Sequence, residues 1–402
     1  MASISSTDLA NALKRYYGSE TLNNVVFGSD DRPASNMLPK SGEFAGSVLD
    51  VPVLYEDSAG GRSATFSNAQ TNASAVEIGR FAIDVVANHQ VVQIDTDALL
   101  RGRNDRGTFL RNQILRVDTG INNLANDVEV GIFGSASGQK GTISATSATT
   151  ITLSDAENAR QFYVNQVLVA AADATSALRA SPGTTTVTGV DYNTGILTVD
   201  TDPSAGDWAA NDLLFTQGDY TAANDVKKLS GFETWLTGTS TLFGQARTAH
   251  SRLQGTAHAG SLADIKKAIT DAAATAKAFA GAKPDLCFCS WDNFASLVDQ
   301  LEADVQRTPG NSTSAGFTSI TVFGPSGPIK IVGATHCTPD TMYLLQTDTW
   351  TIYSMGDLVR VNNDDGLMAS RQASAAGLEV RIDSHANLAC RAPAKNARIT
   401  LS

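Results

Sequence analysis

A narrow apolar stripe along residues 105–133 constrains this chain more than any other feature of its sequence. The stripe residues recur at alternating steps of four and three, and they are Leu110, Ile114, Val117, Ile121, Leu124 and Val128. This spacing places them on one face of an α-helix. At about 1.5 Å per residue the helix would be roughly 40 Å long, more than an ordinary globular domain needs. The pattern predicts a structural spine, with a core helix or a coiled-coil segment as the simpler alternatives.

The charge balance argues against a protein that coats nucleic acid. The chain carries 30 Lys and Arg against 41 Asp and Glu, a formal net charge of −11, whereas general nucleic-acid binding needs a surplus of cations. Nucleic acid near this chain would be enclosed by it rather than tightly bound to it. The first residues lack an apolar signal region, and no stretch reaches the length of a membrane span, so we expect a chain that is neither exported nor membrane-inserted.

The residues before the stripe resemble an arm followed by a long β-hairpin. Residues 1–45 hold a short helix pattern and then a polar stretch, which is typical of an arm rather than a core. From Val48 the apolar and polar positions alternate as in a strand, and residues 58–61 signal a turn. The returning segment, residues 62–72, is polar, so the hairpin offers too little apolar surface to fold onto its own subunit. We therefore expect it to pack on a neighbouring subunit.

Two groups of residues are predicted to contact neighbours. Along the hairpin they are Val51, Val53, Tyr55, Gly60, Gly61, Arg62 and Phe66. At the start of the long helix they are Arg101, Arg103, Arg106 and Arg111, with Arg116 close behind. The arginines would contact nucleic acid or acidic surfaces of neighbours, and the alternative is a solvated helix face with local ion pairs.

Residues 135–225 differ in character from the rest of the chain and contain an internal repeat. They are rich in Thr, Ser, Ala and Val, and they lack helical periodicity. Residues 151–153 match 197–199, Phe162 matches Trp208 and Asn165 matches Asn211, all at an offset of 46 residues. A shared offset is the signature of a duplication. We predict a separate all-β barrel or sandwich built from two similar halves.

The remaining residues return to mixed α/β patterning. Ser261 and Ser290 are predicted to cap two helices on either side of a buried strand at residues 285–289. Further strands are expected at residues 329–332, 342–345 and 349–353, and a final pair at 378–381 and 388–391. This order predicts an α/β domain with a mostly antiparallel sheet.

No arrangement of residues predicts a catalytic, cofactor or metal site. Residues 134–142 superficially resemble a phosphate loop, but the glycine spacing is wrong and no helix follows. The four cysteines lack the spacing of a zinc site, so we expect reduced core cysteines, with Cys287 and Cys289 on one side of a strand. His336 beside Cys337 could form a reactive pair, but its place in a turn favours a structural role.

The order of these parts resembles the major capsid proteins of tailed bacteriophages with the Hong Kong 97 fold. The resemblance rests on the arm, the hairpin and the long helix ending in Gly-Ile-Phe-Gly at residues 131–134, followed by the α/β domain. It covers the chain except residues 135–225, which would be an inserted domain. It implies an α+β fold with an N-terminal arm (1–45), an E-loop (46–75), a P-domain (76–134), an A-domain (226–350) and return strands (351–402).

The resemblance also implies a function and its partners. The chain would form hexamers and pentamers of an icosahedral head that encloses double-stranded DNA, in the virion after assembly in the host cytoplasm. Some relatives crosslink through an E-loop lysine, but no lysine lies between Lys40 and Lys140, which excludes that chemistry here. Only about 45 residues precede the hairpin, so we expect a separate scaffolding protein, a portal and possible decoration proteins. The alternatives are an encapsulin-type nanocompartment shell and an α/β enzyme with an accessory β domain.

Overall fold

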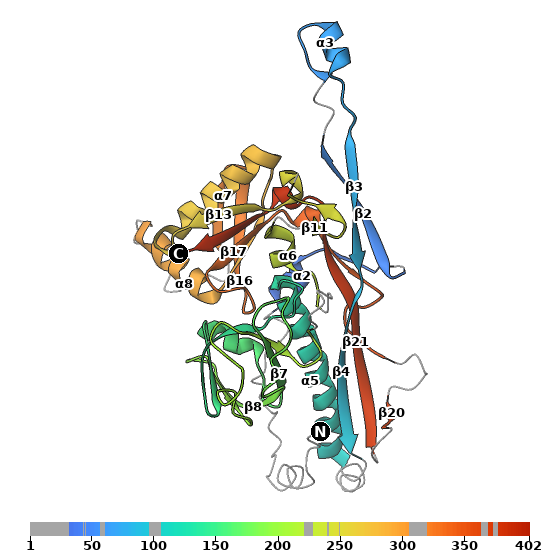
Figure 1. Ribbon diagram of the computed structural model, residues 1–402, viewed down its shortest axis with the longest axis vertical. Coiled ribbons are helices and arrows are strands. Elements are labelled where there is room, and N and C mark those ends of the chain that lie inside the picture. Colours follow the sequence, from blue (N-terminus) through green and yellow to red (C-terminus); the bar gives the residue numbers. More distant parts are fainter. Residues whose placement is uncertain are drawn as a thin grey trace.

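The computed structural model shows an elongated subunit with a hairpin projecting far beyond its body (Figure 1). Below the hairpin lie an α/β domain, a long helix against extended strands, and a small barrel beside that helix. Backbone alone is described at residues 95, 106–115 and 302–304. The described residues are 32–42, 44, 46–56, 61–95, 106–220, 228–238, 241–248, 250–304, 320–362, 369–372 and 377–402.

The long helix, α5 (Arg106–Phe133), begins one residue after its predicted start. It lies along two antiparallel strands, β4 (Val86–Asp95) and β21 (Gly377–Cys390). Leu124 and Val128 of the stripe are buried, and Val117 and Ile121 are half-buried. A Cβ atom at Gly120 would come within 2.6 Å of the Val92 side chain, so helix and sheet are in close contact there. The described part of the stripe therefore packs on the subunit's own sheet, as in a core helix.

Strand β21 replaces the predicted pair of short strands at 378–381 and 388–391. It runs for 14 residues without a turn. It pairs with β4 from Gly377↔Asp95 to Ala386↔Val86, and with β18 (Trp350–Ser354) nearer its end. At the centre of β21, Asp383 is hydrogen-bonded to the side chains of His89 and Asn362, and the strand continues without a turn. The same sheet contains β1 (Lys40–Ser41), β19 (Arg360–Val361) and β20 (Ser370–Arg371).

The prediction that residues up to 45 form an arm rather than a core is wrong for the described part of that segment. Helix α2 (Pro33–Met37) packs against α5 and strand β1 pairs with β18, and Ala34, Leu38 and Phe44 belong to the subunit's largest core. The buried carboxylate of Glu129 accepts hydrogen bonds from the backbone N–H groups of Ala34 and Ser35, both at 2.8 Å. A buried carboxylate that accepts two N–H bonds fixes this segment against α5.

The hairpin is longer than predicted and returns later. Strand β2 (Val48–Glu56) pairs with β3 (Glu77–Asp84), and a short helix, α3 (Phe66–Thr71), occupies the tip. The polar segment at 62–72 is therefore part of the tip and not the returning strand. Its many Ser, Thr and Asn residues suit a turn better than a strand.

Residues 141–216 form a closed six-stranded barrel with strand order β10-β5-β6-β9-β8-β7. The strands are β5 (Gly141–Ser147), β6 (Thr150–Leu153), β7 (Val167–Ala171), β8 (Thr185–Asp191), β9 (Ile196–Val199) and β10 (Leu213–Thr216). A 3-10 helix, η4 (Ala156–Gln161), packs beside β6.

The repeat at an offset of 46 residues is visible in the backbone of the barrel. Asn165 and Asn211 both have positive φ angles, of 70° and 71°. The Asn165 N–H donates to the Val187 carbonyl at 2.8 Å, and the Asn211 N–H donates to the Ile143 carbonyl at 2.7 Å. The three strands β5–β7 therefore correspond to β8–β10, and the barrel has a pseudo-twofold arrangement.

The α/β domain has a six-stranded sheet of order β13-β22-β17-β14-β16-β15 with two helices packed on it. Three of its five strand pairings are antiparallel. Its strands are β13 (Thr256–Gly260), β14 (Leu286–Cys289), β15 (Ile320–Gly324), β16 (Gly327–Gly333), β17 (Thr341–Leu345) and β22 (Ala397–Leu401). Its helices are α7 (Ile265–Ala280) and α8 (Trp291–Asp304).

The structure moves one predicted helix cap in this domain and confirms the predicted placement of two cysteines. Ser261 caps a 3-10 turn, η6 (Leu262–Asp264), and Asp264 caps α7 by accepting from the Lys267 N–H at 3.1 Å. Cys287 and Cys289 are free and buried on one side of β14, as period two predicts, while Phe288 enters the other core. Burial raises the pKa of Cys289 to about 12, which keeps that thiol protonated.

Candidate assembly surface and barrel junction

The two halves of the hairpin have opposite surroundings. Near the body, Val51, Phe81 and Ile83 are buried in the main core. Farther out, the cross-strand pair Leu54 and Ile78 is 63% and 70% exposed. At the tip, α3 buries none of its residues, and the side chain of Phe66 is 84% exposed. The outer hairpin is therefore an apolar surface with no partner among the described residues of the subunit.

The base of the hairpin is fixed by a small second hairpin of β11 (Thr241–Leu242) and β12 (Gln245–Ala246). The Ala82 N–H donates to the Phe243 carbonyl at 3.1 Å, and the Gln245 side-chain amide donates to the Arg80 carbonyl at 2.8 Å. A Cβ at Gly79 would lie 2.6 Å from Gln245 Oε1, so a glycine permits this approach. Phe81 also meets Trp235, of helix α6 (Phe232–Leu236), edge to face at 5.0 Å between ring centroids.

The prediction that the hairpin cannot fold onto its own subunit is therefore wrong for the inner half. Val51 and Val53, predicted to contact a neighbour, are 4% and 7% exposed and belong to the subunit's own core. The reason is that their apolar face of β2 continues in Phe81 and Ile83 of the true returning strand. Tyr55 is half-buried, and its ring lies tilted against that of His250, with 4.5 Å between ring centroids.

The other predicted contact residues divide between the hairpin tip and residues that are not fully described. Gly61 is half-buried within the tip, while Arg62 and Phe66 are exposed there. Gly60, Arg101 and Arg103 lie outside the described residues, and Arg106 and Arg111 are described by their helical backbone alone. Leu54 and Ile78 were not among the predicted contact residues, because Leu54 occupies a polar position of the alternation from Val48 and Ile78 lies beyond the predicted return of the hairpin. Their aliphatic side chains were the available signal.

The barrel is joined to α5 by a cluster of four charged side chains. Asp127 of α5 binds Lys140, just before β5, at 3.1 Å and Lys228, after β10, at 2.7 Å. Lys228 also binds Asp219 at 3.1 Å and donates to Asn88 of β4 at 3.0 Å. Burial alone would raise the pKa of Asp127, but the two lysines lower it well below its usual range. Both ends of the barrel are thus attached to one carboxylate of the long helix.

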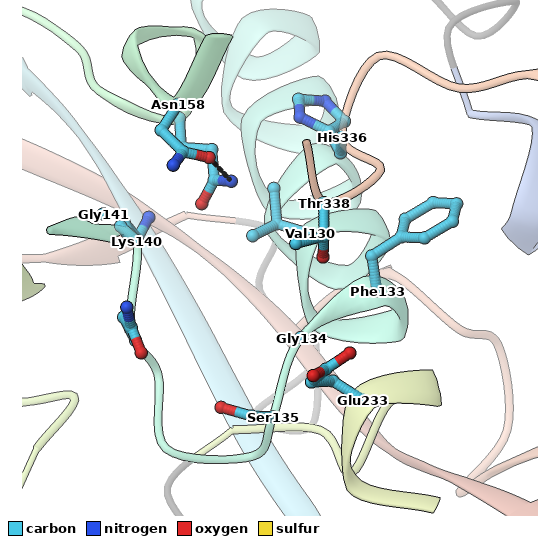
Figure 2. Close-up of a pocket in the computed structure, with 12 residues that line it drawn as sticks. Val130, Phe133, Gly134, Ser135, Lys140, Gly141, Asn158, Glu233, His336 and Thr338 are labelled. Carbon is cyan, nitrogen blue, oxygen red and sulfur yellow. Dashed lines mark hydrogen bonds between the residues drawn. The ribbon is translucent and has the colours of Figure 1, made fainter. Parts of the chain in front are cut away.

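A cavity of about 230 Å³ lies where the barrel, α5 and the α/β domain meet (Figure 2). Its lining residues are Val130, Phe133, Gly134, Ser135, Gln139, Lys140, Gly141, Asn158, Gln161, Glu233, His336 and Thr338. Glu233 accepts hydrogen bonds from the Tyr343 hydroxyl and Arg398 Nε, both at 2.9 Å. Burial lowers the pKa of His336 to about 4, so this imidazole is neutral at pH 7.

Two of the groups at or near the cavity are constrained by an ion pair and by burial. Lys140, in the segment that resembles a phosphate loop, is bound to Asp127. Burial raises the pKa of Cys337 well above its ordinary value, so it does not form a thiolate beside His336. No group of three or more His, Cys, Asp or Glu that could hold a metal occurs within the described ranges. Where helices are described, none is long and apolar enough to cross a membrane.

The barrel also contacts the α/β domain through a pair of carboxyl groups, those of Glu157 and Asp292. Burial, together with a hydrogen bond and repulsion from Asp292, raises the pKa of Glu157 to about 7. Arg160, on the same 3-10 helix, opposes this shift, and Asp340, of the loop before β17, adds to it. Glu157 comes from η4 of the barrel and Asp292 from the first turn of α8. This contact is favourable when one proton is shared between the carboxyl groups.

Comparison with solved structures shows the fold of tailed-phage capsid proteins. The cyanophage A-1(L) capsid protein is 13% identical over 98% of each chain, with a TM-score of 0.52. The capsid of a native GTA particle is 11% identical over 100% of each chain, with a TM-score of 0.51. An encapsulin complex from Synechococcus elongatus PCC 7942 is 9% identical over 97% and 93% of the chains, with a TM-score of 0.45.

The resemblance predicted from the sequence is confirmed at the level of the fold by the first two of these structures. No family model and no curated protein sequence matches the chain.

Proposed function

We propose that this chain is the major capsid protein of a tailed bacteriophage, and that many copies assemble into an icosahedral shell around double-stranded DNA. The observation that carries the proposal is the outer hairpin, where Leu54, Phe66 and Ile78 are exposed on an extension fixed at its base. Exposed apolar surface of this kind marks an interaction site. The shared capsid fold makes another copy of the same chain the natural partner.

Assembly would use heterologous contacts that close into hexamers and pentamers. In this scheme the α/β domain forms the A-domain at the capsomer centre, and α5 with β4 and β21 forms the P-domain. The predicted A-domain bounds of 226–350 are too short, because β22 returns from the C-terminal segment and pairs with β13 and β17 within the same sheet. The hairpin is the E-loop that reaches over a neighbour. The barrel is an inserted domain that braces neighbours or stands on the surface of the shell. The net charge of −11 suits a wall that encloses DNA without binding it tightly.

Other partners follow from the same proposal. A separate scaffolding protein would guide assembly, a portal would occupy one vertex, and a decoration protein is a further candidate partner. The shell would assemble in the host cytoplasm and remain as the capsid of the virion, with no enzymatic activity and no cofactor. The charged cluster at Asp127 would keep the barrel attached to the P-domain while subunits move.

The test is assembly of the purified chain, alone and together with the products of neighbouring genes, followed by negative-stain microscopy and sedimentation. We expect closed shells from the natural chain. Ile78→Asp, which puts a charge on the outer hairpin, should give folded subunits or free capsomers but few shells. Ile78→Val is the matched control and should assemble normally.

Several outcomes contradict the proposal. Monomers or dimers under every condition would exclude a shell protein. Shells that contain protein rather than nuclease-protected DNA when isolated from the natural host would favour a nanocompartment. Normal shells from both Ile78→Asp and Leu54→Asp would show that the hairpin does not make the assembly contact.

A further inference from the structure

Two histidines and a buried aspartate lie together on the face of the β4–β21 sheet that points away from α5. His89 is directly paired with Asp383 in the strand register, and His385 is paired with Ala87, two residues along. Side chains alternate between the faces of a strand. Since Ile382 packs against α5, its neighbour Asp383 and the two histidines share the opposite face.

Asp383 fixes the orientation and tautomer of the His89 ring. Its Oδ1 lies 2.6 Å from His89 Nδ1, and its Oδ2 accepts from the Asn362 side-chain amide at 2.6 Å. The residue is 5% exposed. An ionised carboxylate only accepts hydrogen bonds, so Nδ1 of His89 must carry the proton. In the neutral ring Nε2 then has a free lone pair, and the side chain is 58% exposed to solvent.

The second imidazole, that of His385, lies close enough to His89 for the two rings to share one metal ion. The rings of His89 and His385 have centroids 5.6 Å apart at an interplanar angle of 76°. Because a metal–imidazole bond is about 2.0–2.1 Å long, two rings that share an ion have centroids no more than roughly 6.5 Å apart. His385 makes no side-chain hydrogen bond to the described residues, so its ring can turn about χ2 toward the ion.

We propose that His89 and His385 bind one divalent transition-metal ion, such as Zn²⁺, with Asp383 supporting His89 from behind. Imidazole is a preferred ligand of zinc, copper and nickel, and a carboxylate on the far nitrogen is the usual support of a metal-binding histidine. The described residues offer no third ligand of the His, Cys, Asp or Glu type, so water would fill the remaining positions. The ion would link β4 to β21, strands that are distant in sequence. The inference is independent of the proposed function.

The experiment is titration of the purified full-length chain with Zn²⁺ at pH 7.5 by calorimetry. We expect one ion bound per chain at this site. His89→Gln and His385→Gln should each abolish that binding phase, and Asp383→Asn should weaken it about 10–100-fold. His258→Gln, on β13 of the α/β domain, is the matched control and should bind as the natural chain does.

A second measurement does not depend on the variants folding. Cu²⁺ bound to the natural chain should show electron paramagnetic resonance with nitrogen couplings from two imidazoles. Zn²⁺ binding that persists in His89→Gln and His385→Gln would overturn the proposal. The absence of any stoichiometric binding, or a copper spectrum with a single imidazole, would do the same.

Discussion

Replacing Asp127 by Asn tests whether the charged cluster holds the barrel to the long helix. The change removes the carboxylate that binds Lys140 and Lys228, whose side chains are 9% and 12% exposed. Breaking a buried ion pair costs about 3–5 kcal/mol. We expect about 3 kcal/mol, the lower end of that range, because the Asp127 side chain is 22% exposed and Lys228 keeps Asp219.

The pH dependence of the same cluster has a defined sign. The lysines hold the pKa of Asp127 below its ordinary value of 3.8. A carboxyl whose pKa is lowered by folding stabilises the protein above its unfolded pKa, and that contribution is lost as the pH falls further. The natural chain should therefore lose this stability below about pH 4, whereas Asp127→Asn should show no such component.

Urea denaturation of assembly-incompetent subunits, followed by circular dichroism, measures both effects. Asp271→Asn, which removes an exposed ion pair with Lys267 on α7, is the control and should change little. Adding Lys140→Met to Asp127→Asn should restore part of the loss, because it removes the buried charge left without a partner. Equal stability of Asp127→Asn and the control, or no recovery in the double variant, would refute the reasoning.

Three further predictions concern other contacts. Gly120→Val should destabilise the subunit by about 1–3 kcal/mol through overpacking, since its Cβ would meet Val92 at 2.6 Å; thermal melting unchanged from the natural chain would contradict the close packing. The pKa of Glu157 is raised from 4.5 to about 7, so the folded state favours the protonated carboxyl. The free energy of unfolding should therefore decrease as the pH rises between those two values. The full pKa shift corresponds to about 3 kcal/mol of unfolding free energy, and the partial exposure of Glu157 reduces this to about 1–2 kcal/mol. In denaturation experiments from pH 4.5 to 8, Glu157→Gln should remove this decrease of the unfolding free energy with pH. Phe66→Ser should leave thermal melting of the subunit unchanged and weaken shell assembly in light scattering; lowered melting would show that Phe66 packs within the subunit.

The parts that sequence patterns predicted well are those with strong periodicity. The long helix α5 and the duplicated β domain follow from spacing, because the stripe and the repeat at 46 residues each involve several positions. The repeat left a barrel and a sandwich open, and the structure shows a closed barrel. The burial of Cys287 and Cys289 on one side of β14 follows for the same reason.

The errors occurred where tertiary contacts override local pattern. Two short strands were predicted where β21 is continuous, because the buried Asp383 at its centre is held by His89 from another strand. The segment before residue 45 seemed too polar for a core, yet Glu129 binds the backbone of Ala34 and Ser35 from far along the chain. In the cluster around Asp127, Lys228 lies about a hundred positions along the chain from its partner, and no local sequence pattern predicts such a contact.

The chain enters and leaves the barrel at neighbouring positions. Strands β5 and β10 are paired, with Thr142 opposite Leu213, and the flanking Lys140 and Lys228 bind the same carboxylate. A domain whose two ends lie side by side can be gained or lost in a single genetic event without moving the elements on either side. The duplication inside it is a separate feature, since each half supplies only three strands and the closed barrel needs all six. The subunit thus combines two distinct units, a long helix packed on extended strands and a doubled β unit inserted beside it.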